Sequence, residues 1–363
     1  MNTRMKTIVI VFNSLEIGGI EIKIIDLCNY YSKQKNIRLF LLIKNHTGKL
    51  LKLTPKNIIV ISPPFTDILK IKTLCFPLWL TLKFSEIKPN LILAFGNYSG
   101  VTAVLGEILS FSSAKLIISE DSSIIQQLKS DTFPSLRKLL VKLTYPRADK
   151  IITLTPVGRN KLIKVIPKIG HKVIILNNWL PLKFIGSTPI KKDIDLLFLG
   201  RFEPQKNPLR FLGIVRSITT HYPRLKVVMV GSGSLEPKMK TYISQNKLNI
   251  EIVPATVQVA PFYLRSKVML LTSNHEGFPL TILESLYHRC PVVCPDLKET
   301  ASFFDYQPKT IIYHHDQQAV TNVLRFIGNT KITKNIIRYY QQKIIMTQNH
   351  NFYATLDYLN QYL

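Results

Sequence analysis

Two glutamates that lie eight residues apart, Glu276 and Glu284, stand on either side of a glycine turn in the second half of the chain. The turn consists of Gly277, Phe278, Pro279 and Leu280. We expect it to open into a helix, whose first backbone N–H groups and positive dipole end suit a phosphate. Carboxylates bind phosphate poorly but accept hydrogen bonds from sugar hydroxyls. The segment therefore predicts a site for a nucleotide sugar.

Two basic side chains, Arg201 and Lys206, follow the predicted strand Ile194–Leu199. Arginine offers a fixed fork of donors and lysine a mobile point charge, so that together they could clamp a diphosphate. In doubly wound sheets, ligands bind beyond the carboxyl ends of the strands. This position favours a binding role over a loop of solvated charges.

Glycine turns follow two other predicted strands. Gly18 and Gly19 come after the first strand, and Gly231 comes after the strand Lys226–Val230. Glycine lets a backbone approach a phosphate closely, although a strand-to-helix glycine is often only a turn. The sequence contains no GxGxxG fingerprint, no Walker loop and no GxSxG elbow. These turns support a phosphate site only together with the other motifs.

The sequence predicts no metal site and no other cofactor. Asp193 and Asp195 form a DxD pattern, but they lie at the entrance of a strand, and we interpret them as solvated charges. The cysteines show no CxxC pattern and no histidines at ligand spacing, which predicts reduced core thiols in a cytosolic protein. They are Cys28, Cys75, Cys290 and Cys294.

Strand-like apolar runs alternate with helical patterns along the chain. Continuous Val, Ile and Leu runs suit a parallel sheet that is buried on both faces, and the alternation predicts a doubly wound α/β architecture. In the first half the predicted strands are Thr7–Phe12, Arg38–Ile43, Ile58–Ile61, Leu91–Phe95, Leu116–Ser119, Lys150–Leu154 and Val173–Leu176. In the second half they are Ile194–Leu199, Lys226–Val230, Ile250–Val253, Val268–Leu271 and Pro291–Cys294.

The doubly wound pattern occurs twice, with a predicted boundary at Asn177–Asp193. We expect an N-terminal domain over residues 1–182, a C-terminal domain over 183–342, and a C-terminal helix over 343–363 that returns to the first domain. Thr333–Leu363 is predicted to be helical with a break around Asn349–Asn351. Two such domains would face each other across a central cleft.

The chain has 363 residues and a net charge of +26, which favours polyanions such as nucleic acid or an anionic membrane leaflet. It lacks nucleic-acid-binding motifs, so we expect no nucleic-acid partner.

Lys70–Phe84 mixes lysines with leucines and aromatics, and two interpretations stay open: a segment that rests on a membrane, or a core-facing helix. Met1–Phe12 predicts a strand rather than a signal peptide, and Thr73–Leu82 is too short to span a bilayer. A cytoplasmic protein, peripheral on the inner face of the membrane if Lys70–Phe84 binds lipid, is expected.

Taken together, the motifs resemble the retaining glycosyltransferases of family four, a GT-B group that uses nucleotide-sugar donors. The resemblance covers nearly the whole chain and is densest over Gly200–Lys206, Gly231–Gly233 and Ser273–Val293. It implies two Rossmann-like domains and transfer of a hexose or N-acetylhexosamine, by family habit from a UDP-sugar. The acceptor would be a lipid-linked or growing saccharide in surface polysaccharide biosynthesis. The alternatives are a GT-B sugar-nucleotide epimerase or another non-transferring GT-B protein and, ranked lower, a basic nucleic-acid-binding protein.

The same resemblance implies roles for individual residues. Arg201 and Lys206 would hold the diphosphate, and Glu276 would accept hydrogen bonds from the donor sugar. Glu284 would bind the ribose hydroxyls, and the amides of the glycine turn would contact sugar and phosphate. The other donor contacts implied are Gly18, Gly19, Gly231 and, near the nucleobase, Pro254.

Two positions depart from the family's pattern. Family members often carry a histidine shortly after the fifth strand, whereas this chain has Glu120 and Asp121 there. Either carboxylate could contribute instead, or the chain could handle its acceptor differently. Where the family usually has glycine two residues before Pro291, this chain has Arg289, which should perturb a helix end more than the chemistry.

Overall fold

The computed structural model describes residues 5–64, 71–121, 133–180, 191–301 and 303–363. The chain divides into two compact units. Unit 1 comprises Met1–Pro181 and Asn351–Leu363, and unit 2 comprises Leu182–His350. Residues 181–190, which belong to the predicted boundary segment, lie outside the described residues.

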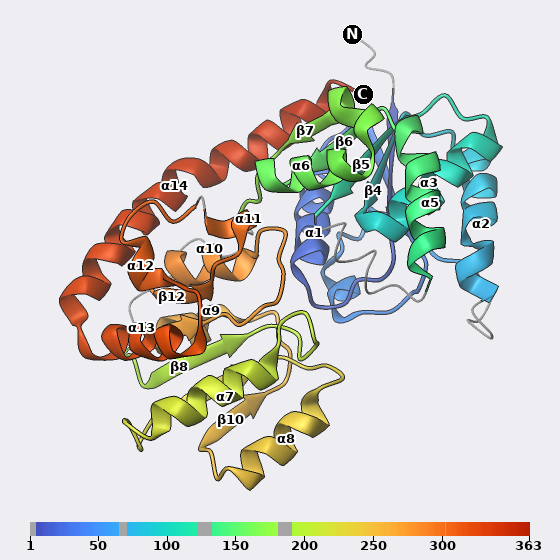
Figure 1. The fold of residues 1–363 in the computed structure, drawn as a ribbon. Coiled ribbons are helices and arrows are strands. Elements are labelled where there is room, and N and C mark those ends of the chain that lie inside the picture. The colour runs from blue at the N-terminus through green and yellow to red at the C-terminus, as the bar shows by residue number, and fades with distance from the viewer. Residues whose placement is uncertain (1–4, 65–70, 122–132, 181–190, 302) are drawn as a thin grey trace. The chain divides into compact units, whose positions relative to one another are not determined.

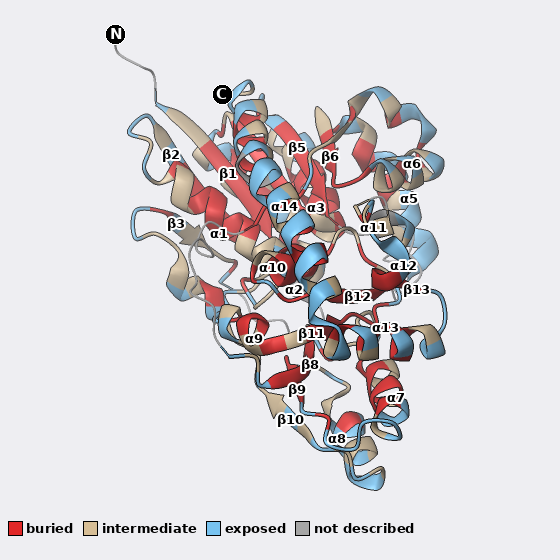
Figure 2. Cartoon of the chain, turned by 90° about the vertical axis from the view of Figure 1, so that its left-hand side faces the viewer, coloured by how far each residue is buried: buried red, intermediate tan, exposed pale blue. Residues whose placement is uncertain are grey.

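Unit 1 is built on a parallel sheet with the strand order β3-β2-β1-β4-β5-β6-β7 within the described residues. Every strand predicted in the first half is present, with its ends shifted by at most one residue. The central strands are buried on both faces, as continuous aliphatic runs require (Figure 2). The strands are β1 (Lys6–Phe12), β2 (Ile37–Ile43), β3 (Ile59–Ile61), β4 (Leu91–Phe95), β5 (Lys115–Glu120), β6 (Lys150–Thr153) and β7 (Val173–Ile175).

Helices cover both faces of this sheet (Figure 1). One core cluster joins α2, α3 and α5 to alternate strand residues, and a second joins α1 to the opposite face together with residues from the end of the chain. The helices are α1 (Gly19–Tyr31), α2 (Ile71–Ile87), α3 (Gly96–Ser110), α5 (Pro134–Thr144) and α6 (Pro156–Val165), with 3-10 turns η1 (Lys49–Leu53), η3 (Tyr145–Arg147) and η4 (Pro167–Lys172).

Unit 2 repeats the architecture, with the parallel strand order β10-β9-β8-β11-β12-β13 in the part that the structure describes. The strands are β8 (Ile194–Leu199), β9 (Val227–Val230), β10 (Ile250–Val253), β11 (Ser266–Leu270), β12 (Val292–Pro295) and β13 (Ile312–Tyr313). The helices are α7 (Pro208–Thr219), α8 (Glu236–Gln245), α9 (Ala260–Arg265), α10 (Leu280–Tyr287), α11 (Lys298–Ala301), α12 (Pro308–Ile311), α13 (Asp316–Gly328) and the part of α14 (Thr330–Asn360) that precedes Asn351. The predicted α/β fold with two doubly wound parallel sheets is confirmed.

The C-terminal segment is one continuous helix, α14, so the predicted break around Asn349–Asn351 was wrong. Asparagine has a modest intrinsic helix penalty, which packing overrides here. Asn351 donates from Nδ2 to the backbone oxygen of Asn178 at 3.0 Å, and the next residue, Phe352, is buried. Residues from Asn351 onward belong to unit 1.

Asp195 is not the solvated charge that the sequence suggested. It is buried, pairs with Lys267 at 2.7 Å, and accepts a hydrogen bond from the backbone N–H of Lys226. Asp193 is more exposed and forms two hydrogen bonds to Arg265. Both aspartates stabilise the start of β8 through neighbouring elements.

The four cysteines are free, and all but Cys75 are buried. In the described part of the chain, no helix combines the length and the apolar character needed to cross a bilayer.

Arg289, at the end of α10, adopts a left-handed backbone with φ 58°. A residue with a Cβ atom in this left-handed conformation destabilises the folded state by roughly 1 kcal/mol relative to glycine, which has no Cβ. We expect Arg289→Gly to stabilise unit 2 by up to about 1 kcal/mol, measured by calorimetry, because relief of strain outweighs the added freedom of the unfolded chain. Arg289→Ala keeps the strain and is the control. An equal gain from alanine would contradict this explanation.

Candidate active site

The loops after β8 and β11 lie at the point of the unit 2 sheet where the strand order reverses. In the sheet, β8 has β9 on one side and β11 on the other, so that successive connections run in opposite directions. Doubly wound sheets bind ligands beyond the carboxyl ends of the strands at such a switch point. The two motifs predicted to bind a donor, residues 200–207 and 271–280, follow these two strands.

Hydrogen bonds tie the two loops to each other. Asn274 donates from its backbone N–H to the oxygen of Gln205 at 2.8 Å and from Nδ2 to the oxygen of Pro204 at 2.8 Å. Thr272 donates from Oγ1 to the backbone oxygen of Lys206 at 3.0 Å. Side chains on these loops are therefore held in a fixed geometry, as a binding site requires.

Lys206 and Glu276 form the central contact of the site. Lys206 Nζ lies 2.5 Å from Glu276 Oε1, and the two side chains are only 13% and 6% exposed. The lysine stem packs over Gly200, where a Cβ would lie 3.4 Å from Lys206 Cγ. The pair places one positive and one negative group side by side at the strand ends. An ammonium and a carboxylate of this kind suit a ligand that carries both phosphate and hydroxyl groups.

Glu284 lies on α10 and is buried with its carboxyl group against Tyr263 of α9. The Tyr263 hydroxyl donates to Glu284 Oε2 at 2.8 Å. Burial raises the pKa of Glu284 to about 7, while the Tyr263 hydrogen bond and the charge of Lys206 oppose the rise. Sequence reasoning missed Tyr263, because a tyrosine in a short helix carries no spacing signal that links it to a distant glutamate.

The start of α10 lies between the two glutamates. Pro279 is its N-cap and provides no side-chain cap. Among the described residues, Ser273 Oγ and Thr281 Oγ1 are buried hydroxyl oxygens without a hydrogen-bond partner. Such unpaired groups are uncommon in folded proteins and can be satisfied by a bound ligand. Sequence reasoning did not single out these two hydroxyls.

Other predicted residues of unit 2 lie around this centre. Arg201 is exposed, and its Nη2 donates to Gln205 Oε1 at 2.9 Å. Gln205 in turn donates to the backbone oxygen of His275 at 3.3 Å, which connects Arg201 to the second loop. Phe278 packs edge-on against Phe303 at 5.5 Å between ring centroids. Gly277 is half-buried and Leu280 is the first residue of α10.

Gly231 and Pro254 follow β9 and β10. A Cβ at Gly231 would lie 2.0 Å from the backbone oxygen of Gly200, so close packing of the two turns requires glycine there. This close contact is sufficient to explain why position 231 is a glycine. The predicted contact of Gly231 with a phosphate stays a prediction. Pro254 is exposed at the end of the edge strand β10, and its predicted place near a nucleobase also stays a prediction.

The remaining predicted residues belong to unit 1. Gly18 is the N-cap of α1, and Gly19 is its first residue. A Cβ at Gly18 would lie 2.3 Å from Glu21 Oε2, so a carboxylate accompanies the glycine pair that was expected to contact phosphate.

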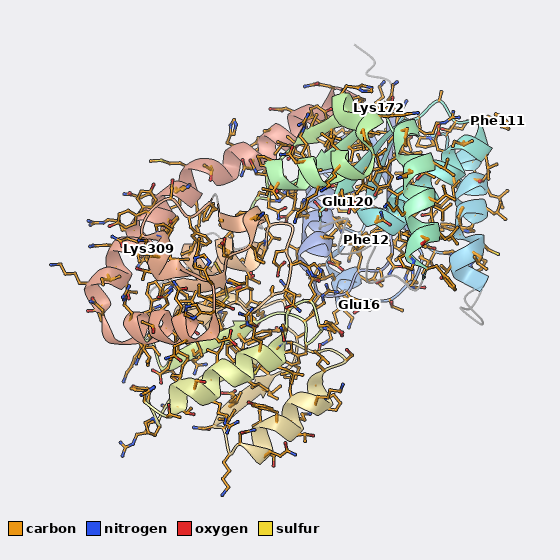
Figure 3. All side chains as sticks on the ribbon, viewed as in Figure 1. Phe12, Glu16, Phe111, Glu120, Lys172 and Lys309 are labelled. Carbon is orange, nitrogen blue, oxygen red and sulfur yellow. The ribbon has the colours of Figure 1, made fainter. Side chains whose placement is uncertain are left out.

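Glu120 lies at the carboxyl end of β5 and is buried inside unit 1, where Figure 3 labels it. The Tyr145 hydroxyl donates to Glu120 Oε2 at 2.5 Å, and Asn97 donates to the Tyr145 oxygen at 3.3 Å. Glu120 Oε1 has no hydrogen-bond partner among the described residues. Burial raises the pKa of Glu120 to about 8, so the carboxyl group is mostly protonated at neutral pH.

Asp121 is engaged in a different, buried contact. Lys23 of α1 lies 2.8 Å from Asp121 Oδ1, and Ser119 donates to the same oxygen at 3.1 Å. Lys23 also lies over the ring of Trp179 at 5.0 Å. Asp121 therefore joins α1 to the end of β5, while its second oxygen, Oδ2, has no hydrogen-bond partner among the described residues, as is also the case for Glu120 Oε1. Both carboxylates stay candidates for contact with a substrate.

The structure thus pairs Lys206 with Glu276 in unit 2, places Glu284 against Tyr263, and groups Glu120 with Tyr145 in unit 1. The charge of Lys206 lowers the pKa of Glu284, opposing the rise caused by burial. No cluster of three or more histidine, cysteine, aspartate or glutamate side chains suited to a metal ion occurs among the described residues.

Comparison with known proteins identifies the second unit. Residues 183–344 match the family model "Glycosyl transferases group 1". This part of the chain is a domain of that type.

Two curated relatives carry related names. An uncharacterized glycosyltransferase of Methanocaldococcus jannaschii is 25% identical over 231 residues, which cover 59% of this chain and 57% of that protein. The second, 27% identical over 251 residues, is the N-acetylgalactosamine-N,N'-diacetylbacillosaminyl-diphospho-undecaprenol 4-alpha-N-acetylgalactosaminyltransferase of Campylobacter jejuni. That match covers 66% of this chain and 67% of the relative. The chain therefore spans little more than half of one relative and two thirds of the other.

Solved structures share the fold over nearly the whole chain. Anabaena HepE, in complex with UDP and glucose, superposes with a TM-score of 0.79 at 15% identity. The superposition covers 98% of this chain and 100% of HepE. At this identity the likeness shows the GT-B fold, with its two Rossmann-like units.

Proposed function

We propose that this protein is a retaining glycosyltransferase of family four. It moves a hexose or N-acetylhexosamine from a nucleoside-diphosphate sugar, UDP by preference, to a lipid-linked or growing saccharide in surface polysaccharide biosynthesis. The proposal rests above all on one observation: Lys206 and Glu276 pair at the switch point of the sheet in the part of the chain that matches the glycosyl transferases group 1 model. The relatives' names support the reaction class, and the undecaprenol-linked acceptor of the Campylobacter enzyme supports the acceptor class.

In this proposal the donor lies across the loops after β8 and β11. Lys206 and Arg201 hold the diphosphate, and the uncapped start of α10 provides further donors. Glu276 accepts hydrogen bonds from the sugar, and Glu284 accepts them from the ribose. Glu276 is buried and pairs with Lys206 in the structure. When the donor binds, the Lys206 ammonium turns toward the phosphate, and the contact between the two side chains weakens.

The chemistry follows from where charge develops. As the bond between the anomeric carbon and the diphosphate oxygen breaks, negative charge builds on the diphosphate and positive charge on the sugar. Fixed cations aimed at the departing group stabilise this state. The acceptor hydroxyl forms the new glycosidic bond on the same face, and its proton passes to the departing phosphate. In unit 1, Glu120 and Asp121, each with one unpaired buried oxygen, are the candidates for contact with the acceptor.

A thermal-shift panel of UDP-, GDP-, ADP- and CMP-sugars tests donor binding. A true donor raises the melting temperature with concentration, because it binds the folded state by mass action. Glu276→Ala should abolish the shift, whereas Glu236→Ala, which changes an exposed surface pair on α8, should keep it. No shift with any sugar nucleotide would contradict the proposal. Conversion of the donor to its epimer without an acceptor would instead identify an epimerase.

A further inference from the structure

The outer side of the α2, α3 and α5 layer in unit 1 carries exposed apolar side chains. On α5, Leu136, Leu139 and Leu143 are 54%, 52% and 62% exposed. Their spacing of three and four residues places them in one stripe along the helix. Val141 and Thr144, on the opposite side of α5, are buried. Leucines so exposed along a whole helix stripe are typical of an interaction surface.

Helix α2 shows the same division. Leu74, Leu78 and Leu82 follow each other at intervals of four residues and are 76%, 59% and 68% exposed. Phe76, Leu80 and Phe84 are fully buried in the core of unit 1. The helix therefore packs as a core-facing helix and also presents a second, exposed apolar stripe. The core-facing interpretation of Lys70–Phe84 holds for the buried side, and the membrane interpretation stays a prediction for the exposed side. Residues 65–70 lie outside the described residues.

Helix α3 packs between these two helices and extends the apolar surface at its C-terminal end. Both α2 and α5 contact α3, and all three contribute to the same core cluster on one face of the sheet. Leu109 is 50% exposed and Phe111 is 96% exposed. Figure 3 shows Phe111 at the outer edge of unit 1. We call the exposed leucines of α2 and α5 with Leu109 and Phe111 the leucine face.

The charges around the leucine face have one sign on α5. This helix carries Arg137, Lys138 and Lys142 and contains no acidic residue. Lys138 and Lys142 are exposed and lie one turn apart, beside the leucine stripe. On α2, the acidic residue Glu86 is paired with Lys83. On α3, the half-buried Glu107 is the acidic residue near Leu109, so the positive charge of the face is carried by α5. A partner that matches the α5 side of the face is therefore apolar and anionic.

We propose that the leucine face rests on an anionic lipid bilayer. The leucines and Phe111 enter the boundary between headgroups and acyl chains, and Lys138 and Lys142 contact lipid phosphates. A second copy of the chain fits less well, because a symmetric contact would bring the same lysines together in a protein of net charge +26. The proposal is independent of the glycosyl-transfer chemistry, since none of these residues belongs to the donor site.

Co-sedimentation of the full chain with vesicles tests this surface. The protein should bind phosphatidylcholine vesicles that contain phosphatidylglycerol, and bind pure phosphatidylcholine at least about tenfold less. Leu136→Gln/Leu139→Gln/Leu143→Gln should lower binding about tenfold or more. Ile345→Gln/Met346→Gln replaces two exposed apolar residues by glutamine on α14 in unit 2 and should leave binding unchanged.

The lysines are tested in the same way. Lys138→Gln/Lys142→Gln should weaken binding to the anionic vesicles about tenfold, whereas Lys331→Gln/Lys334→Gln on α14 should have little effect. The melting temperature and the donor-induced shift report that each variant is folded and keeps its donor site. If the leucine variant and the lysine variant both bind the anionic vesicles as strongly as wild type, the proposal is overturned. A dimer in solution that the leucine variant dissociates, without vesicle binding, would overturn it in favour of a second copy.

Discussion

Replacing Lys206 by methionine is expected to lower turnover about a hundredfold to a thousandfold, because one fixed donor aimed at a charged transition state contributes on that scale. Methionine keeps the apolar stem that packs over Gly200 and removes only the charge. The measurement is release of nucleoside diphosphate at saturating donor. We expect kcat to fall much more than KM rises, since the charge on the departing diphosphate grows in the transition state.

The matched control is Lys240→Met. Lys240 lies on α8 in the same unit and pairs with Glu236 at 2.8 Å on the surface, so its loss should leave kcat unchanged. Removal of Lys206 also leaves Glu276 buried beside a neutral side chain, and circular dichroism must show that the variant is folded at the assay temperature. A defect confined to KM would assign Lys206 to ground-state binding alone.

The second large effect concerns Glu120 and pH. Its folded-state pKa, about 8, lies above its ordinary value of 4.5, so the folded protein holds a proton there that the unfolded chain has lost. Stability from this group is complete below pH 4.5 and is lost as pH rises through about 8. Glu120→Gln cannot ionise and keeps an oxygen that accepts from Tyr145. Between pH 4.5 and pH 9, we expect the variant to gain about 4 kcal/mol relative to wild type.

Tryptophan fluorescence in denaturant measures this difference. The chain has two tryptophans, Trp79 and Trp179, and both lie in unit 1 with Glu120. The control is Glu86→Gln, whose glutamate is 65% exposed and should not alter the pH dependence. Parallel curves of unfolding free energy against pH for wild type and Glu120→Gln would show that the buried carboxyl group is ionised throughout.

Much of the fold follows from the sequence, because strands buried on both faces leave a continuous aliphatic signal. Ile8, Val9, Ile10 and Val11 are all fully buried in β1, and such runs marked the strands to within two residues. β13 was missed because Ile312–Tyr313 is too short to show any period. The break in α14 was predicted from local asparagine propensity, whereas the contacts of Asn351 and Phe352 decide the structure.

In the candidate site, too, features encoded locally were predictable and features that depend on tertiary packing were not. The loops with Lys206 and Glu276 were predictable, since each follows a strand and the sheet order places both strands together. The contact of Tyr263 with Glu284 depends on how α9 packs against α10, which no local pattern encodes. The partners of Glu120 and Asp121 in unit 1 could not be predicted either, because they are distant in the sequence. Tyr145 and Lys23 reach them across 25 and 98 residues of sequence, respectively.

The path of α14 has a consequence for how the chain is synthesised. Phe352, Leu356 and Leu359 fill the same core as β1 and α1, and Tyr31 donates to Asn360 at 3.2 Å. During synthesis, the first 180 residues therefore emerge from the ribosome before the helix residues that complete their hydrophobic core. The core of unit 1 can be completed only after the whole of unit 2 has been synthesised. Chaperones that shield nascent apolar surface should matter more for this protein than for one whose domains each finish folding in turn.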